Sequence, residues 1–125
     1  MELTQQAPAG SLQIVESYGE AGFKVSGRRH PGSVLILPDA TQSWPVDDVT
    51  NLSLPSLQPI IDAEPAIELL IIGCGARLAL VPLTLREVLR TKSVGVETMD
   101  TGAACRTYNV LAGEGRRVAA ALIAL

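Results

Sequence analysis

The sequence has few of the residues on which most catalytic and metal sites depend. Aromatic residues make up 3% of its 125 residues, and there are two cysteines and one histidine. That histidine, His30, cannot alone supply the Cys/His spacing of a zinc site, and a Ser–His–Asp or Cys–His site would have to include it by coincidence of folding. We therefore assign no catalytic, cofactor-binding or metal-binding residues, and the composition favours a non-catalytic protein.

Long hydrophobic runs and a positive net charge are also absent. The longest apolar runs, AIELLIIG and VAAALIAL, are far shorter than the ~20 residues that cross a bilayer. The net charge is −3, so no basic face for nucleic acid is expected. The basic segment Lys24–His30 is interpreted as the solvated end of a hairpin, with a phosphate site or a partner contact as alternatives.

No secretory or mitochondrial leader pattern is visible in the opening residues MELTQQAPAG. Without a secretory leader, Cys74 and Cys105 are expected to be free thiols in a reducing compartment. The sequence therefore predicts a cytoplasmic protein without a transmembrane segment.

Hydrophobic residues, by contrast, make up 47% of the chain and charged residues 18%, a balance typical of one compact domain. Because aromatic residues are scarce, the core is expected to be aliphatic. Residues 1–11 are polar and contain Pro and Gly, so we predict a flexible segment there and a single domain over 12–125.

Apolar patterning predicts strands that alternate with helices, which is typical of an α/β fold with parallel pairing. A hairpin near the start makes the sheet mixed. Strands are expected at 12–18, 23–27, 33–38, 66–73 and 93–99, helices at 55–65, 82–90 and 100–115, an edge strand or loop at 39–48, a turn at 28–32, and a strand or apolar helix at 116–125.

The segment LLIIGCGARLALVPLTLREVLRTKSVGVE imitates a dinucleotide-binding fingerprint, with glycines after a strand and Glu97 further on. Two details contradict that interpretation. Leu78 occupies the third glycine position, and Pro82 delays the helix whose N-terminus should face the phosphates. We therefore expect Gly73 and Gly75 to allow a sharp turn at the end of a strand.

Open α/β sheets bind ligands at the carboxyl ends of their strands. If the strands ending at Gly73 and Met99 are parallel neighbours, the glycine turn and the start of the next helix should lie side by side. The candidate functional surface at this edge comprises Gly73, Cys74, Gly75, Arg77, Asp100, Thr101, Arg106 and Asn109. Helix capping and ordinary surface charge are the alternative interpretation of these polar residues.

The helix expected at 100–115 has an apolar stripe formed by Ala104, Tyr108 and Leu111, which Ala103 and Val110 should widen. Cys105 and Asn109 are four residues apart and share a neighbouring face. We expect the cysteine to be a buried apolar residue and the asparagine to bind loop backbone.

The segments IGCGAR and GVETMDTGAACRTYNVLAGEGRRVAAALI resemble a specific family over residues 14–123. This is the small α/β domain family of unknown function that includes the mitochondrial respiratory complex I assembly factor 3 and an adipogenesis-associated domain protein. Its most specific pattern is Thr101, Ala104, Tyr108–Asn109, Leu111 and Glu114–Gly115–Arg116.

The resemblance implies a three-layer single domain. A central mixed five-stranded sheet would have one antiparallel strand, with helices and a small β element on its faces. It also implies that the run 118–125 is a strand, and the antiparallel one. Relatives commonly have threonine where this chain has Cys74, which argues against thiol chemistry shared across the family.

The resemblance implies no family-wide activity or cofactor, and the mitochondrial relative acts through protein contacts. We therefore expect an assembly-factor-like binding module, monomeric or weakly homodimeric, with an unidentified protein partner. The alternative is a small-molecule or anion-binding protein, or an enzyme, with its site at the Gly73–Arg77 turn and the Thr101–Asn109 helix.

Overall fold

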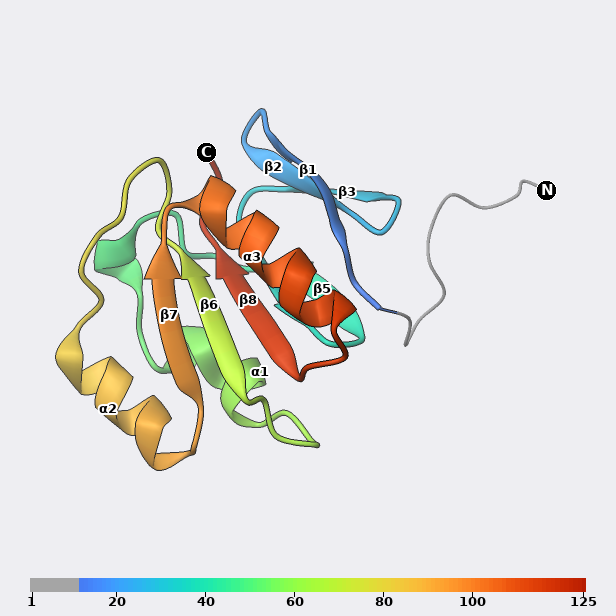
Figure 1. Cartoon of the computed structure of the whole chain (residues 1–125). Helices are drawn as coiled ribbons and strands as arrows, with labels where there is room; N and C mark the ends of the chain where they lie inside the picture. Colours follow the sequence, from blue (N-terminus) through green and yellow to red (C-terminus); the bar gives the residue numbers. More distant parts are fainter. Residues whose placement is uncertain (1–11) are drawn as a thin grey trace.

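The computed structural model describes residues 12–125, and the predicted flexible segment 1–11 lies outside the described residues. Its centre is a five-stranded sheet with the strand order β5–β4–β8–β6–β7 (Figure 1). The strands are β4 (Val34–Leu37), β5 (Ala40–Ser43), β6 (Leu69–Gly73), β7 (Gly95–Met99) and β8 (Val118–Leu122).

One strand of this sheet runs opposite to the others, as the resemblance implied, but it is β4. β8 pairs in parallel with β6 and antiparallel to β4. The expectation that the C-terminal strand is the antiparallel one was therefore wrong. β8 follows β7 through a crossover helix, and such a connection returns the chain in the same direction.

The first three strands form a separate antiparallel sheet, β1 (Val15–Gly19), β2 (Gly22–Val25) and β3 (Arg28–Pro31). The turn predicted at 28–32 was wrong, because those residues form β3. The chain instead turns at Ser26 and Gly27, whose φ angles of 46° and 85° lie in the left-handed region. The basic residues Arg28 and Arg29 therefore lie on a strand.

Three α-helices accompany the sheets: α1 (Gln58–Ile61), α2 (Leu83–Thr91) and α3 (Thr101–Gly113). Short 3₁₀ turns cover Val49–Asn51 and Pro55–Leu57. α3 begins where Asp100 Oδ1 accepts a hydrogen bond from Ala103 N at 2.9 Å, which makes Asp100 the N-cap.

The two faces of the five-stranded sheet are both covered, which gives three layers (Figure 1). Ile71 and Ala120 pack toward α3 and the three-stranded sheet. Their strand neighbours Leu70 and Ala121 pack toward α1 and α2 on the opposite face. Strands covered on both faces have almost uninterrupted apolar sequences, which is why β6 could be predicted. The equally apolar run that contains β8 fitted a strand or a helix, and the resemblance implied the strand that is found.

The buried stripe of α3 differs from the predicted one. Ala104 and Tyr108 are fully buried as expected, but Cys105 and Ala112 complete the stripe. Val110 was expected to widen it and is 60% exposed. Two residues along a helix are about 200° apart around the axis, so Val110 lies almost opposite Tyr108.

Candidate functional site

The glycine turn and the start of α3 lie together at the carboxyl edge of the sheet, as predicted. Gly73 pairs with Met99 across the parallel β6 and β7 strands. Beyond this pair, Cys74 N donates a hydrogen bond to Met99 O at 2.8 Å. The two segments from which the candidate surface was assembled are therefore direct neighbours.

Thr101 connects three elements at this edge. Its Oγ1 accepts a hydrogen bond from Gly75 N at 2.9 Å and donates one to Ile123 O at 2.8 Å. Its own backbone N–H donates to Gly75 O at 2.8 Å. Because Thr101 is fully buried and its hydroxyl is engaged on both sides, its role is to hold the ends of β6 and β8 against α3.

The two glycines have distinct steric reasons to be glycine. A Cβ on Gly73 would lie 3.0 Å from Thr101 Cα and 3.0 Å from Leu122 Cδ2, so a methyl group there would require the backbone of Thr101 to shift. Gly75 has a φ of +98°, a conformation that residues with a side chain rarely adopt. The φ of Gly75 supports the predicted sharp turn, whereas Gly73 allows the close approach of Thr101 to β6.

The two cysteines lie on opposite faces of the central sheet and are free. Cys74 is buried, and its Sγ lies 3.7 Å from Ala79 O. Burial raises the pKa of Cys105 from 9.0 to about 12, against the opposing influence of the Arg106 charge. Cys105 therefore remains a neutral, buried apolar residue at neutral pH, as expected.

Asn109 binds backbone, as expected, and the backbone belongs to β1. Its Oδ1 accepts a hydrogen bond from Val15 N at 2.9 Å, and its Nδ2 donates one to Val15 O at 2.8 Å. This pair of bonds reproduces the pattern of a neighbouring strand and joins α3 to the three-stranded sheet. Both polar atoms of the Asn109 side chain are therefore occupied by hydrogen bonds that stabilise the fold.

Arg77 and Arg106 are the exposed cations of the candidate set. Arg106 Nη1 donates a hydrogen bond to Tyr18 Oη at 3.3 Å. Arg77 lies on the loop that follows the glycine turn. Of the eight predicted residues, these two arginines present charge to solvent, whereas Gly73, Cys74, Gly75 and Thr101 are buried.

Sequence reasoning missed a group of exposed leucines directly after the turn. Leu78, Leu80 and Leu83 are 65%, 95% and 68% exposed. The loop that carries them is anchored, because Val81 between them is buried in the core. The available signal was the unbroken apolar segment LALVPL, in which alternate residues cannot all face one core.

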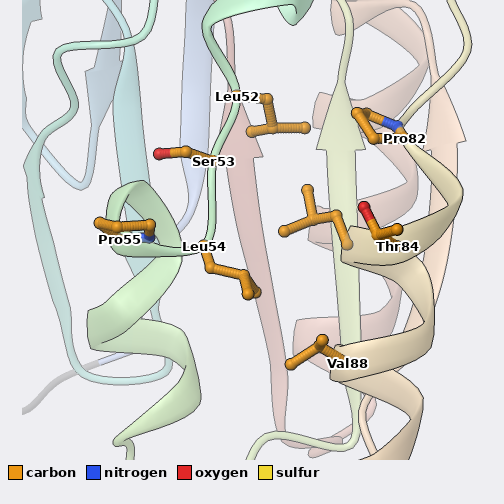
Figure 2. Close-up of a pocket in the computed structure, with 8 residues that line it drawn as sticks. Leu52, Ser53, Leu54, Pro55, Pro82, Thr84 and Val88 are labelled. Atoms are coloured by element: carbon orange, nitrogen blue, oxygen red, sulfur yellow. The ribbon is translucent and has the colours of Figure 1, made fainter.

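A groove of about 420 Å³ lies on the side of the molecule formed by α2 (Figure 2). It separates the segment 52–55 from the first turns of the helix. Its lining is mostly apolar and consists of Leu52, Ser53, Leu54, Pro55, Pro82, Thr84, Leu85 and Val88.

Across residues 12–125, no three His, Cys, Asp or Glu side chains group as a metal site would require. Nor is any helix within this part of the chain long and apolar enough to span a bilayer.

A family model described as a protein of unknown function (DUF498/DUF598) matches residues 15–123. The chain belongs to the DUF498/DUF598 family. A relative from Danio rerio, NADH dehydrogenase (ubiquinone) 1 alpha subcomplex assembly factor 3, is 36% identical over 121 residues. The matched region covers 97% of this chain and 68% of that relative, and 64% of the human protein of the same name.

Solved structures of other proteins share the fold. A Rhodopseudomonas palustris protein is 44% identical with a TM-score of 0.82, covering 100% of this chain and 93% of that one. A Bordetella pertussis protein described as an Mth938-like domain is 33% identical with a TM-score of 0.79, covering 98% and 92%. The three-layer arrangement is therefore the Mth938-like fold.

Proposed function

We propose that this DUF498/DUF598 protein is a non-catalytic, assembly-factor-like module that acts through protein contacts. Its working surface is the carboxyl edge of the sheet, from the Gly73–Arg77 turn along the loop to Leu83. The observation that carries the proposal is the exposure of Leu78 and Leu80 on an anchored loop and of Leu83 at the start of α2. Three large apolar side chains exposed within six residues are more than the single surface hydrophobics that need no explanation, and such exposure favours a protein interaction site.

The polar residues at this edge support a contact surface over a reaction site. Asp100, Thr101 and Asn109 are engaged in hydrogen bonds that hold the fold together. Arg77 and Arg106 remain at the surface, where they can add charge specificity to an apolar contact. Buried members of the candidate set thus shape the surface, and exposed members contact the partner.

The Danio rerio relative is named as an assembly factor of an NADH dehydrogenase. An NADH dehydrogenase is therefore the first complex whose assembly should be tested for dependence on this protein. The free cysteines are consistent with work in a reducing compartment such as the cytoplasm. A monomeric or weakly homodimeric state, with an unidentified protein partner, is part of the same proposal.

Deletion of the gene, followed by complementation, tests this proposal. We expect the deletion to reduce the amount of assembled NADH dehydrogenase on native gels, and the wild-type gene to restore it. A variant with Leu78→Ser, Leu80→Ser and Leu83→Ser should fail to restore it although the chain still folds, since exposed substitutions usually change stability within about 0.5 kcal/mol each.

Val110→Ser is the matched control, because Val110 is also exposed and apolar but lies on α3, away from the loop. It should complement as well as the wild type. Unchanged amounts of assembled enzyme in the deletion strain would refute the NADH dehydrogenase assignment. Full complementation by the triple serine variant would refute the leucine surface.

A further inference from the structure

β7 is an edge strand whose outer side carries no strand partner in the part of the chain that the structure describes (Figure 1). Gly95 N donates a hydrogen bond to Glu68 O, and Met99 O accepts one from Cys74 N. The backbone groups of Gly95 and Met99 therefore point toward β6. Backbone groups alternate along a strand, so those of Val96 and Thr98 point to the free edge. This edge is a ready template for another strand.

A groove of about 390 Å³ runs beside this free edge. One wall is a single face of α2, formed by residues at helical spacing, and the other is the start of β7. The lining consists of Leu83, Arg86, Glu87, Arg90, Val94, Gly95 and Val96. Leu83, the first residue of α2, is also one of the three exposed leucines of the proposed contact surface, so the groove continues that surface.

The charge of the groove indicates what kind of strand fits. Arg86 and Arg90 outnumber Glu87 along the α2 wall. Arg86 Nη2 donates a hydrogen bond to Thr98 Oγ1 at 3.3 Å, which places its guanidinium directly beside the strand. An added strand would direct alternate side chains toward this wall, where carboxylates would meet arginine.

Charge disfavours one register of pairing with a second copy of the chain. If Val96 paired with Thr98 of an antiparallel second β7, the pairing would centre on Glu97 and place the two Glu97 carboxylates directly opposite each other. Like charges at such positions destabilise strand pairing. Glu97 is exposed and alternates with Val96 and Thr98, so it faces away from α2.

We propose that the free edge of β7 binds an extended segment of a partner protein as an additional strand. On the α2 side, that segment presents acidic side chains to Arg86 and Arg90 and an apolar side chain to Leu83. Opposite Glu97 it carries a basic or neutral residue. Backbone hydrogen bonds to Val96 and Thr98 supply the affinity, and the alternating side chains supply the specificity. This inference rests on the proposed function and names the chemistry of its partner.

Selection of random peptides displayed on phage against the whole protein tests the inference. We expect enriched peptides to alternate acidic or apolar residues with basic or neutral ones. When such a peptide, made synthetically, saturates the protein, hydrogen exchange at the Val96 and Thr98 amides should slow at least about tenfold, because these N–H groups gain acceptors. N-methylation should be applied in turn to the odd-numbered and to the even-numbered residues of the peptide. Only the set whose N–H groups point toward β7 should abolish binding when methylated.

The charged wall has a matched pair of variants. Arg86→Glu combined with Arg90→Glu should weaken binding at least about tenfold, whereas Lys24→Glu, at an exposed position of β2 in the three-stranded sheet, should leave it nearly unchanged. The strand inference is overturned if no peptide is enriched, or if the peptides protect the 78–80 loop and leave Val96 and Thr98 exchanging freely. Protection of these amides by raised protein concentration alone would assign the edge to a second copy. None of these results depends on the complementation experiment, so the two proposals fail separately.

Discussion

Thr101→Val is expected to lower the free energy of unfolding by roughly 2–4 kcal/mol, because each buried polar group left without its partner costs about 1–3 kcal/mol. Valine preserves the shape of the side chain and removes the hydroxyl. Gly75 N–H and Ile123 C=O then lose their partner inside a fully buried site. Urea unfolding followed by circular dichroism measures the loss.

Two further threonine variants separate the hydroxyl from other effects of the substitution. Thr101→Ser keeps the hydroxyl and should lose clearly less stability than Thr101→Val. Thr84→Val, at an exposed position of α2, should change stability by no more than about 0.5 kcal/mol. Equal losses in Thr101→Ser and Thr101→Val would contradict the role given to the hydroxyl.

Gly73→Ala should destabilise the protein by about 1–3 kcal/mol, the usual cost of an extra methyl group forced into a packed site. The new Cβ would lie 3.0 Å from Thr101 Cα, and backbone atoms at this junction cannot yield as a flexible side chain would. The effect should be measured as a shift in the urea midpoint with an unchanged slope.

Gly113→Ala is the opposite case within the same chain. A Cβ at Gly113 meets no atom of another part of the fold within 4 Å, and the residue is the last of α3. Alanine there should raise stability by about 0.5–1 kcal/mol, since it restricts the unfolded chain and favours helix. A Gly73→Ala protein as stable as the wild type would contradict the tight junction between β6, β8 and α3.

Much of the fold could be predicted because its central strands are covered on both faces. The apolar runs containing β4 and β6 identified buried strands, and the α/β alternation followed from the helical segments between them. The juxtaposition of Gly73 with the start of α3 was predicted from parallel pairing alone. The register of β6 with β7, in which Gly73 lies opposite Met99, confirms it. The resemblance added the three layers and the single antiparallel strand.

The remaining features depend on contacts that a local pattern does not contain. Arg28–Pro31 form a strand because the chain turns earlier, at residues with positive φ. The direction of β8 follows from its crossover connection, which the apolar sequence of the strand does not express. Leu78 and Leu80 are exposed because Val81, and not either leucine, is the residue of this loop that is buried in the core.

The candidate surface was predicted as one group of residues with a shared function. The structure divides the group into buried residues that hold the fold together and exposed residues that a partner can contact. Thr101 and Asn109 were chosen for their polar groups, but long-range hydrogen bonds to Ile123 and Val15 occupy those groups. Sequence spacing could not reveal partners so far along the chain. Arg77 and Arg106 stay exposed at the surface, where a partner protein can contact them.

Site-specific photocrosslinking in living cells tests the central claim, that the loop after the glycine turn contacts another protein. A photoreactive phenylalanine analogue replaces Leu80, which is 95% exposed, and in a matched strain it replaces Val110, which is 60% exposed. We predict a reproducible adduct with one or a few identified proteins from position 80 and none of them from position 110. No protein adduct at position 80, or the same adducts at both positions, would contradict the claim.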